Sequence, residues 1–146
     1  YVYWKRTSPH PMMTLFDAPD RESSCVMRSR SNTALQSLGL LNETQRVEMS
    51  RKLAERLIKS TDDDQRRLDF LYGLLSSRKH TANEKKACIK LVSTMRERYK
   101  SSEEDALALI SSGDAPRDQK IPVTELAAWT QLTTIVLASD AAILIY

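Results

Sequence analysis

The residues best suited to chemistry stand close together near the start of the chain. Three acidic side chains and three arginines follow neither a helical nor a strand period there: Asp17, Asp20, Arg21, Glu22, Arg28 and Arg30. Paired carboxylates can catalyse proton transfer when their surroundings separate their pKa values, and with turn carbonyls they can bind a hard cation such as Ca²⁺. The catalytic candidates are therefore Asp17, Asp20, Arg21 and Arg28. Candidates for binding a ligand follow directly: Arg30, Asn32 and Gln36.

The same cluster also fits a purely structural role. Its arginines can pair with its acids and fasten an irregular segment to the rest of the protein. Removing one partner of such a buried pair would strand a charge and cost about 3–5 kcal/mol. We favour this interpretation because the numbers of acidic and basic side chains match.

Histidine and cysteine are too scarce for a metal site. A zinc site needs about four ligands, and the chain offers Cys25, Cys88, His10 and His80, which are far apart in sequence. Two cysteines are also too few for a disulfide framework. We expect both to be small buried side chains, although one bridge between them remains open if the protein is exported. The chain has no Cys-x-x-Cys-His motif, so no covalent haem is expected and no cofactor is predicted in this chain.

Other catalytic signatures are missing from the sequence. There is no glycine-rich phosphate loop, no metalloprotease helix motif and no recognisable Ser/His/Asp arrangement. Tyr3, Trp4 and Trp129 could stack on a sugar ring, but packing in a core is the favoured role for such side chains. Whether the protein is an enzyme therefore stays open.

Composition predicts an all-α fold. The 146 residues include only 3 Gly and 5 Pro, which is few for the turns of a sheet. A net charge of +3 is too small to indicate nucleic-acid binding. The longest uncharged run, Leu126–Ser139, is shorter than the roughly 20 residues that span a bilayer.

The elements that must position these residues follow from hydrophobic periodicity. We expect one domain over residues 1–146, with a largely non-helical strap (1–31) and a helical body (32–146). Asn32 is the expected cap of the first helix, and Thr81 and Ser101 each begin an expected capping box with a glutamate three residues later. The body is expected to be an irregular bundle of five to six helices: Thr33–Leu41, Glu43–Lys59, Asp63–Ser77, a helix from the Thr81 cap to Tyr99, a short helix ending at Gly113, and Val123–Asp140.

Several dense motifs point to a known family. They are Tyr3-Trp4-Lys5-Arg6-Thr7, the run Phe16–Glu22, Arg28-x-Arg30-x-Asn32-Thr33-x-Leu35-Gln36, Leu40-Leu41-Asn42, and Glu125–Thr130 followed by Leu137 and Asp140. Together they resemble the C-terminal part of the planctomycete surface-protein domain known as domain of unknown function 1553. The chain differs from many members at Ser29 and Ser31, and over residues 137–140.

The resemblance implies context rather than chemistry. Members resemble large exported proteins of planctomycetes and related bacteria, often with a cytochrome-c-like domain and a companion domain, sometimes with sugar-binding modules. No activity is known for the domain. The chain opens on Tyr1-Val2-Tyr3-Trp4 without Met, so we expect a fragment of a larger protein. The expected location is the periplasm or the cell surface.

The expected function is a non-catalytic helical module. It would scaffold or dock neighbouring cytochrome-like domains of the parent protein, or an extracellular partner such as a polysaccharide. One alternative is part of a polysaccharide-related or redox active site that the upstream region completes. A second alternative is a carbohydrate-binding module.

Overall fold

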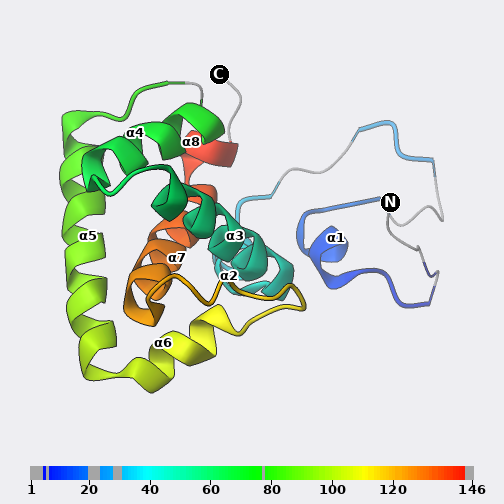
Figure 1. The fold of residues 1–146 in the computed structure, drawn as a ribbon. Coiled ribbons are helices and arrows are strands. Elements are labelled where there is room, and N and C mark those ends of the chain that lie inside the picture. The colour runs from blue at the N-terminus through cyan, green and yellow to red at the C-terminus, as the bar shows by residue number, and fades with distance from the viewer. Residues whose placement is uncertain (1–4, 6, 20–23, 28–30, 77, 144–146) are drawn as a thin grey trace. The chain divides into compact units, whose positions relative to one another are not determined.

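The protein is all-α, as the composition predicts. A computed structural model describes residues 5, 7–19, 24–27, 31–76 and 78–143. These residues contain eight helices and no strand, with one isolated bridge between Lys5 and Ser8 (Figure 1). The helix count exceeds the expected five to six because the structure adds two short helices, α1 (Pro11–Leu15) and α8 (Asp140–Ile143).

The chain divides into two compact units, Tyr1–Asn42 and Glu43–Tyr146. The first unit holds α1 and α2 (Ala34–Asn42). The second holds the remaining helices: α3 (Thr44–Ser60), α4 (Asp64–Leu75), α5 (Ala82–Ser101), α6 (Glu103–Ile110), α7 (Val123–Leu137) and α8. The single domain and the boundary at residue 31 stay predictions.

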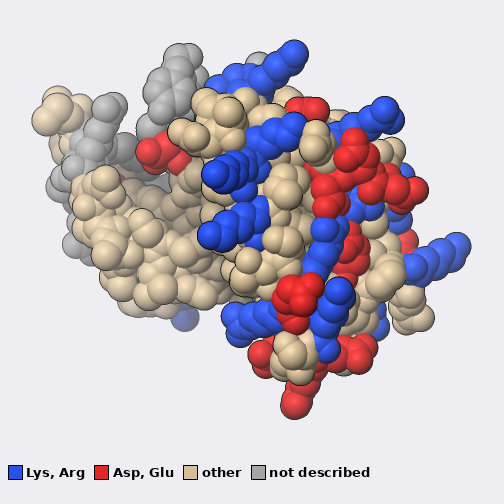
Figure 2. Space-filling model, turned by 90° about the vertical axis from the view of Figure 1, so that its left-hand side faces the viewer, with Lys and Arg blue, Asp and Glu red and all other residues tan. Residues whose placement is uncertain are grey.

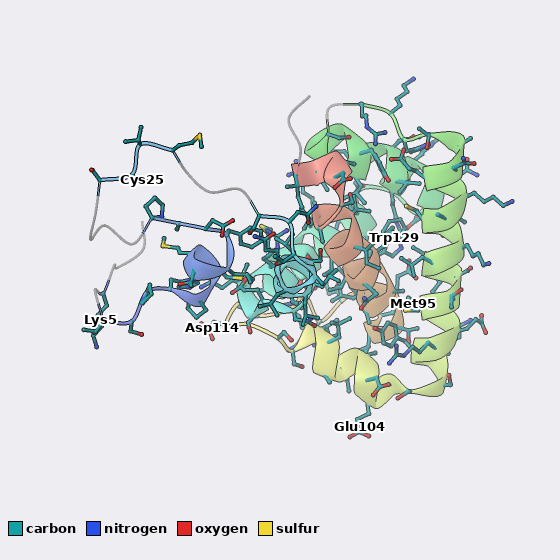
Figure 3. All side chains as sticks on the ribbon, turned by 180° about the vertical axis from the view of Figure 1, so that it is seen from behind. Lys5, Cys25, Met95, Glu104, Asp114 and Trp129 are labelled. Carbon is teal, nitrogen blue, oxygen red and sulfur yellow. The ribbon has the colours of Figure 1, made fainter. Side chains whose placement is uncertain are left out.

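Helix α7 is the centre of the second unit. It contacts α3, α5, α6 and α8, and Figure 1 shows the long α5 running along one side of it. Glu125 is its only charged residue, and a helix that is apolar on all sides is normally buried. Its buried residues accordingly face every direction: Leu126, Ala127, Ala128, Trp129, Thr130, Leu132, Thr133, Thr134 and Val136. Figure 3 shows Trp129 on α7 in the space next to α5.

Local capping rules explain several helix starts in this unit. The Asp63 side chain accepts a hydrogen bond from the amide of Gln65 at the start of α4. The predicted capping box of α5 is present, with Thr81 and Glu84 each bonding the other's backbone amide. The predicted box at Ser101 is wrong. Ser101 is the last residue of α5, and its hydroxyl donates to carbonyls of the preceding turn instead.

One polar face of α3 holds the long loop between α6 and α7. Arg51 donates to the carbonyl of Ala115 (2.6 Å) and Lys52 donates to that of Pro116. Glu55 accepts from the amide of Asp118 (3.1 Å), and Lys59 pairs with the Asp118 carboxylate (2.6 Å). We call residues 112–121 the clasped loop.

Candidate functional site

The structure describes three of the seven residues proposed from the sequence: Asp17, Asn32 and Gln36. The other four lie outside the described residues: Asp20, Arg21, Arg28 and Arg30. The proposed pairing of acids with arginines in the strap therefore stays a prediction.

Asp17 ends α1 in a left-handed conformation, with φ of 54°. Its amide donates to the carbonyl of Thr14 (3.4 Å) and the amide of Ala18 donates to that of Met13 (2.9 Å), which is the Schellman pattern of a helix end. The Asp17 carboxylate accepts from the hydroxyl (2.6 Å) and the amide (2.9 Å) of Ser31. These two hydrogen bonds lower the pKa of Asp17, so the group stays ionised at neutral pH and is a poor general acid.

Gln36 is the buried centre of the first unit. Its Nε2 donates to the carbonyl of Leu15 (2.9 Å) and to the hydroxyl of Ser31 (2.8 Å), and its Oε1 accepts from the amide of Thr33 (3.1 Å). The amide of Gln36 donates back to the Thr33 hydroxyl (3.2 Å). Thr33 and Gln36 therefore form a capping box, because a glutamine stands three residues after the hydroxyl. The prediction that Asn32 caps this helix is wrong, and Asn32 is exposed.

A groove of about 820 Å³ runs between α1 and α2, within the first unit. We call it the α1–α2 groove, and its lining is mostly apolar: Pro11, Met12, Thr14, Leu15, Asp17, Ser31, Thr33, Leu35, Leu38, Gly39 and Asn42. Leu35 and Leu38 are 63% and 55% exposed. The two helices approach closely at Gly39, where a Cβ would press on the Leu15 side chain.

The second unit contains a charge cluster that the sequence reasoning missed. Asp64, Arg67, Arg96 and Glu125 come from α4, α5 and α7, and we call them the four-charge network. Arg96 binds both oxygens of Asp64 (2.6 and 2.8 Å) and both oxygens of Glu125 (2.7 Å each). Arg67 adds bonds to Glu125 (2.6 Å), Asp64 (3.3 Å) and the carbonyl of Thr61 (2.7 Å).

Hydrogen-bond capacity in this network is nearly used up. Glu125 accepts from Arg67, from Arg96 through each oxygen, and from the indole N–H of Trp129 (3.0 Å). Three of these bonds end on Oε1 and one ends on Oε2, out of the roughly four acceptor positions that a carboxylate offers. The Arg67 guanidinium also lies 5.5 Å from the centre of the Trp129 ring. Glu125 thus keeps about one acceptor position, on Oε2, for any further donor.

The network is also held fully charged. Hydrogen bonds from Arg96 lower the pKa of Asp64. Burial opposes the ionisation of Glu125, but its arginine partners outweigh burial and its pKa is still lowered. The two carboxylates raise the pKa of Arg96 further above its already high value. Groups that keep their charge at all ordinary pH values cannot exchange protons with a substrate near neutrality.

A pocket of about 850 Å³ lies beside the network. Its lining mixes acidic, basic and apolar side chains: Ile58, Asp62, Asp63, Asp64, Gln65, Arg67, Ile89, Arg96, Lys100, Pro122, Thr124 and Glu125. Figure 2 looks onto the side of the molecule where α5 runs, and acidic and basic side chains lie next to one another there. Because acidic and basic side chains alternate there, the pocket has no electrostatic potential of a single sign that would attract a charged ligand.

The remaining candidates from the sequence do not assemble a reactive site. Trp129 is fully buried, so it cannot stack on a sugar ring. Cys25 and Cys88 are both free thiols; Cys88 is buried as expected, whereas the expectation of burial is wrong for Cys25, which is exposed. Burial raises the pKa of Cys88, whose thiol lies 3.9 Å from the hydroxyl of Tyr72, so it stays protonated at neutral pH. Within the described residues, no three His, Cys, Asp or Glu side chains are grouped to hold a metal ion.

One sequence signal could have located the four-charge network. Glu125 is the single charge on an otherwise uncharged helix, and a carboxylate buried with such a helix needs a cation. The sequence does not say which cation, because Arg96 looks like any other basic residue of α5.

Comparison with known proteins gives a family but no activity. Residues 1–92 match the model of a family described as a protein of unknown function (PSD1, DUF1553). This match confirms the resemblance found from the motifs, although the closing motif Glu125–Thr130 lies outside the matched residues. No curated protein and no solved structure matches the chain.

Proposed function

The chain belongs to the PSD1 family of proteins of unknown function (DUF1553), and we propose that it is a non-catalytic helical module that docks neighbouring domains. The observation that carries the proposal is the densely hydrogen-bonded four-charge network. It joins α4, α5 and α7, and most acceptor positions of Glu125 are taken by arginine and tryptophan donors. Such an arrangement fixes three helices relative to one another, and the lowered pKa values of Asp64 and Glu125 make these two carboxylates poor proton donors near neutral pH.

The first unit supports the docking part of the proposal. Apolar side chains there are exposed although they line one groove, with Leu35 and Leu38 each more than half accessible to solvent. An apolar groove of this kind on a small helical unit is typical of a surface that another protein covers.

The cellular context of the proposal rests on the family resemblance. We propose a large exported or cell-surface bacterial protein, in which the module docks a cytochrome-like domain, a companion domain or an extracellular partner. None of the helices that the structure describes is long and apolar enough to cross a membrane.

The enzymatic alternative has less support. It needs Asp17, Asp20, Arg21 and Arg28 to form a polysaccharide-related or redox site with an upstream region. Of these only Asp17 is described, and its lowered pKa suits neither a general acid nor a strong base. The carbohydrate-binding alternative cannot use Trp129 to stack on a sugar, because this side chain is buried in the core.

The proposal can be tested by the stability of Glu125→Gln. Catalytic groups are often held at a cost in stability, so neutralising them commonly stabilises the protein. A structural partner behaves oppositely: the neutral amide would leave two arginines sharing one carboxylate, and the free energy of unfolding should fall by about 3–5 kcal/mol. Urea denaturation of the 146-residue chain measures this difference.

Glu104→Gln is the matched control for this experiment. Glu104 is exposed on α6, and Figure 3 shows it pointing away from the helices. The free energy of unfolding of Glu104→Gln should stay within about 0.5 kcal/mol of that of the unchanged protein. If Glu125→Gln is as stable as the unchanged protein or more stable, the network does not stabilise the fold, and the non-catalytic proposal loses the observation that carries it.

A further inference from the structure

The first unit has a polar centre and an apolar surface. Gln36 is its only buried residue among those described, and the hydrogen bonds of Gln36 tie the end of α1 to the start of α2. Leucines occupy the outside instead, since Leu35 and Leu38 line the α1–α2 groove and are mostly exposed. A short segment with no apolar core of its own gains little from folding alone. Its stability therefore requires another surface against these leucines.

The groove is formed in advance of any partner. Three connections hold its walls: Gln36 with Leu15, Gln36 with Ser31, and Asp17 with Ser31. Close contact at Gly39 fixes the spacing of the two helices further along. A groove whose walls are held by hydrogen bonds loses little conformational entropy when a partner binds.

The charge of Asp17 indicates that a partner of the groove carries a basic side chain. Among the residues that the structure describes, Asp17 is the only charged one that lines the groove. Both Ser31 bonds go to its Oδ2, and Oδ1 makes no hydrogen bond to any residue that the structure describes. An ionised oxygen at the edge of an apolar groove attracts a cation that is carried next to apolar groups.

We infer that the α1–α2 groove binds an apolar segment of a neighbouring domain in which leucine-like side chains adjoin a lysine or arginine. The apolar side chains cover Leu35 and Leu38, and the basic side chain reaches Asp17. This inference rests on the proposed docking function and specifies its surface and the chemistry of the partner.

Two blocked tripeptides test the inference directly. Acetyl-Leu-Leu-Lys-amide and acetyl-Leu-Leu-Glu-amide differ only in the last side chain and its charge. Each is titrated into the ¹⁵N-labelled chain while backbone amide shifts are followed by NMR. The lysine peptide should shift the amides of Leu15, Leu38 and Gly39 saturably and bind about two- to fivefold more tightly than the glutamate peptide. That preference should shrink in about 1 M salt, where charges are screened within ~3 Å.

Asp17→Asn isolates the charge. Asparagine tolerates the left-handed conformation and still accepts the Ser31 hydrogen bonds, so the groove should stay intact. Both peptides should then bind equally well. Leu38→Ser should weaken both peptides, whereas Leu107→Ser, at a partly exposed leucine of α6, is the control and should change neither.

Three results would overturn the inference. Absence of saturable shifts with either peptide would show that the groove does not take such a segment. Equal binding of the two peptides to the unchanged chain would show that the charge of Asp17 is already neutralised. Shifts of the same amides on dilution without peptide would show that a second copy of the chain is the occupant.

The two proposals fail separately. If the peptides do not bind but Glu125→Gln destabilises the protein, the docking surface lies elsewhere and the non-catalytic role stands. If Glu125→Gln stabilises the protein, the proposed function fails whatever the peptides do.

Discussion

Arg96 shows why a particular side chain, and not only its charge, is needed at a junction of helices. Its guanidinium makes two fork-shaped pairs at once, one with Asp64 and one with Glu125. A lysine ammonium is a single point of charge and cannot present parallel donors to two carboxylates. Residue identity at this position therefore determines how α4, α5 and α7 meet.

Gly113 allows a prediction about one residue. Its φ of 87° lies in the left-handed region, and a Cβ placed there would lie 2.7 Å from the Cβ of Glu48. Gly113→Ala should lower the free energy of unfolding by about 1–3 kcal/mol because of backbone strain and this clash. Urea denaturation measures the change.

Gly73→Ala is the control for that substitution. Gly73 lies within α4, and an added Cβ would meet no atom within 4 Å. Alanine there should stabilise the protein by roughly 0.5–1 kcal/mol, since glycine is a poor helix former. Equal effects at the two glycines would contradict the backbone argument.

Single residues could be predicted from the sequence where the signal is local. The capping box of Thr81 and Glu84 was predicted because both partners lie within four residues of each other. Arg96 was not, since its partners stand 32 and 29 residues away. The sequence offered Glu125 as an isolated charge but no means of choosing its cation.

At the scale of elements, the clasped loop depends on the side chains of one helix. Arg51 is nearly fully buried and donates to the carbonyl of Ala115. Arg51→Met should keep the packing volume but leave that carbonyl without its donor, at a cost of about 1–3 kcal/mol. Hydrogen exchange of the loop amides should speed up, most clearly at Asp118, while amides of α5 keep their rates.

Lys100→Met is the comparison for this experiment. Lys100 is exposed on α5, with its nearest acidic oxygen 3.6 Å away on Glu97. Its replacement should leave the clasped loop unchanged. If Arg51→Met leaves the exchange of residues 112–121 at the original rates, Arg51 is not needed to hold the loop.

The elements themselves were mostly predictable from periodicity. The expected helices Glu43–Lys59 and Asp63–Ser77 correspond to α3 and α4 within two residues at each end. The short helix α1 was not expected, because residues 1–31 were predicted to form a largely non-helical strap. Pro11 begins the helix, a position that proline favours. Asn32 was chosen as a cap by residue type alone, and the reciprocal partner Gln36 favours Thr33.

At the scale of the whole molecule, acid should weaken the fold within a defined range of pH. Hydrogen bonds from Arg78 and from the amide of Thr81 lower the pKa of Glu84 from 4.5 to about 2, and the pKa values of Asp64 and Glu125 are also lowered. A carboxylate with a lowered pKa in the folded state stabilises the fold above its unfolded pKa, and this contribution is lost as pH falls towards the folded value.

The free energy of unfolding should therefore be nearly constant from pH 7 to about 5 and fall between about pH 4.5 and 2. Urea denaturation across this range measures it. The Glu84→Gln variant should lose less stability over the same interval, because one of the responsible carboxylates is gone. A wild-type stability that stays level down to about pH 2 would contradict this account.

The all-α class of the molecule followed from its composition, whereas its division into two units did not. Hydrophobic periodicity describes each helix separately and does not indicate which helices share a core. Leu35 and Leu38 stand three residues apart, as on one apolar face of a packed helix, yet they are exposed. The four-charge network could not be predicted for the same reason, because its residues come from segments that are far apart in the sequence.

The central place of α7 has a consequence for synthesis. A ribosome makes α3, α5 and α6 well before Val123–Leu137, the helix against which they pack. Until that helix emerges, the apolar faces of the earlier helices that pack on α7 are uncovered in the nascent chain. Arg67 and Arg96 also lack their partner Glu125 at this stage. The second unit therefore cannot complete its core until residues 123–137 have left the ribosome, and a chain released before residue 123 would be a substrate for chaperones or proteases.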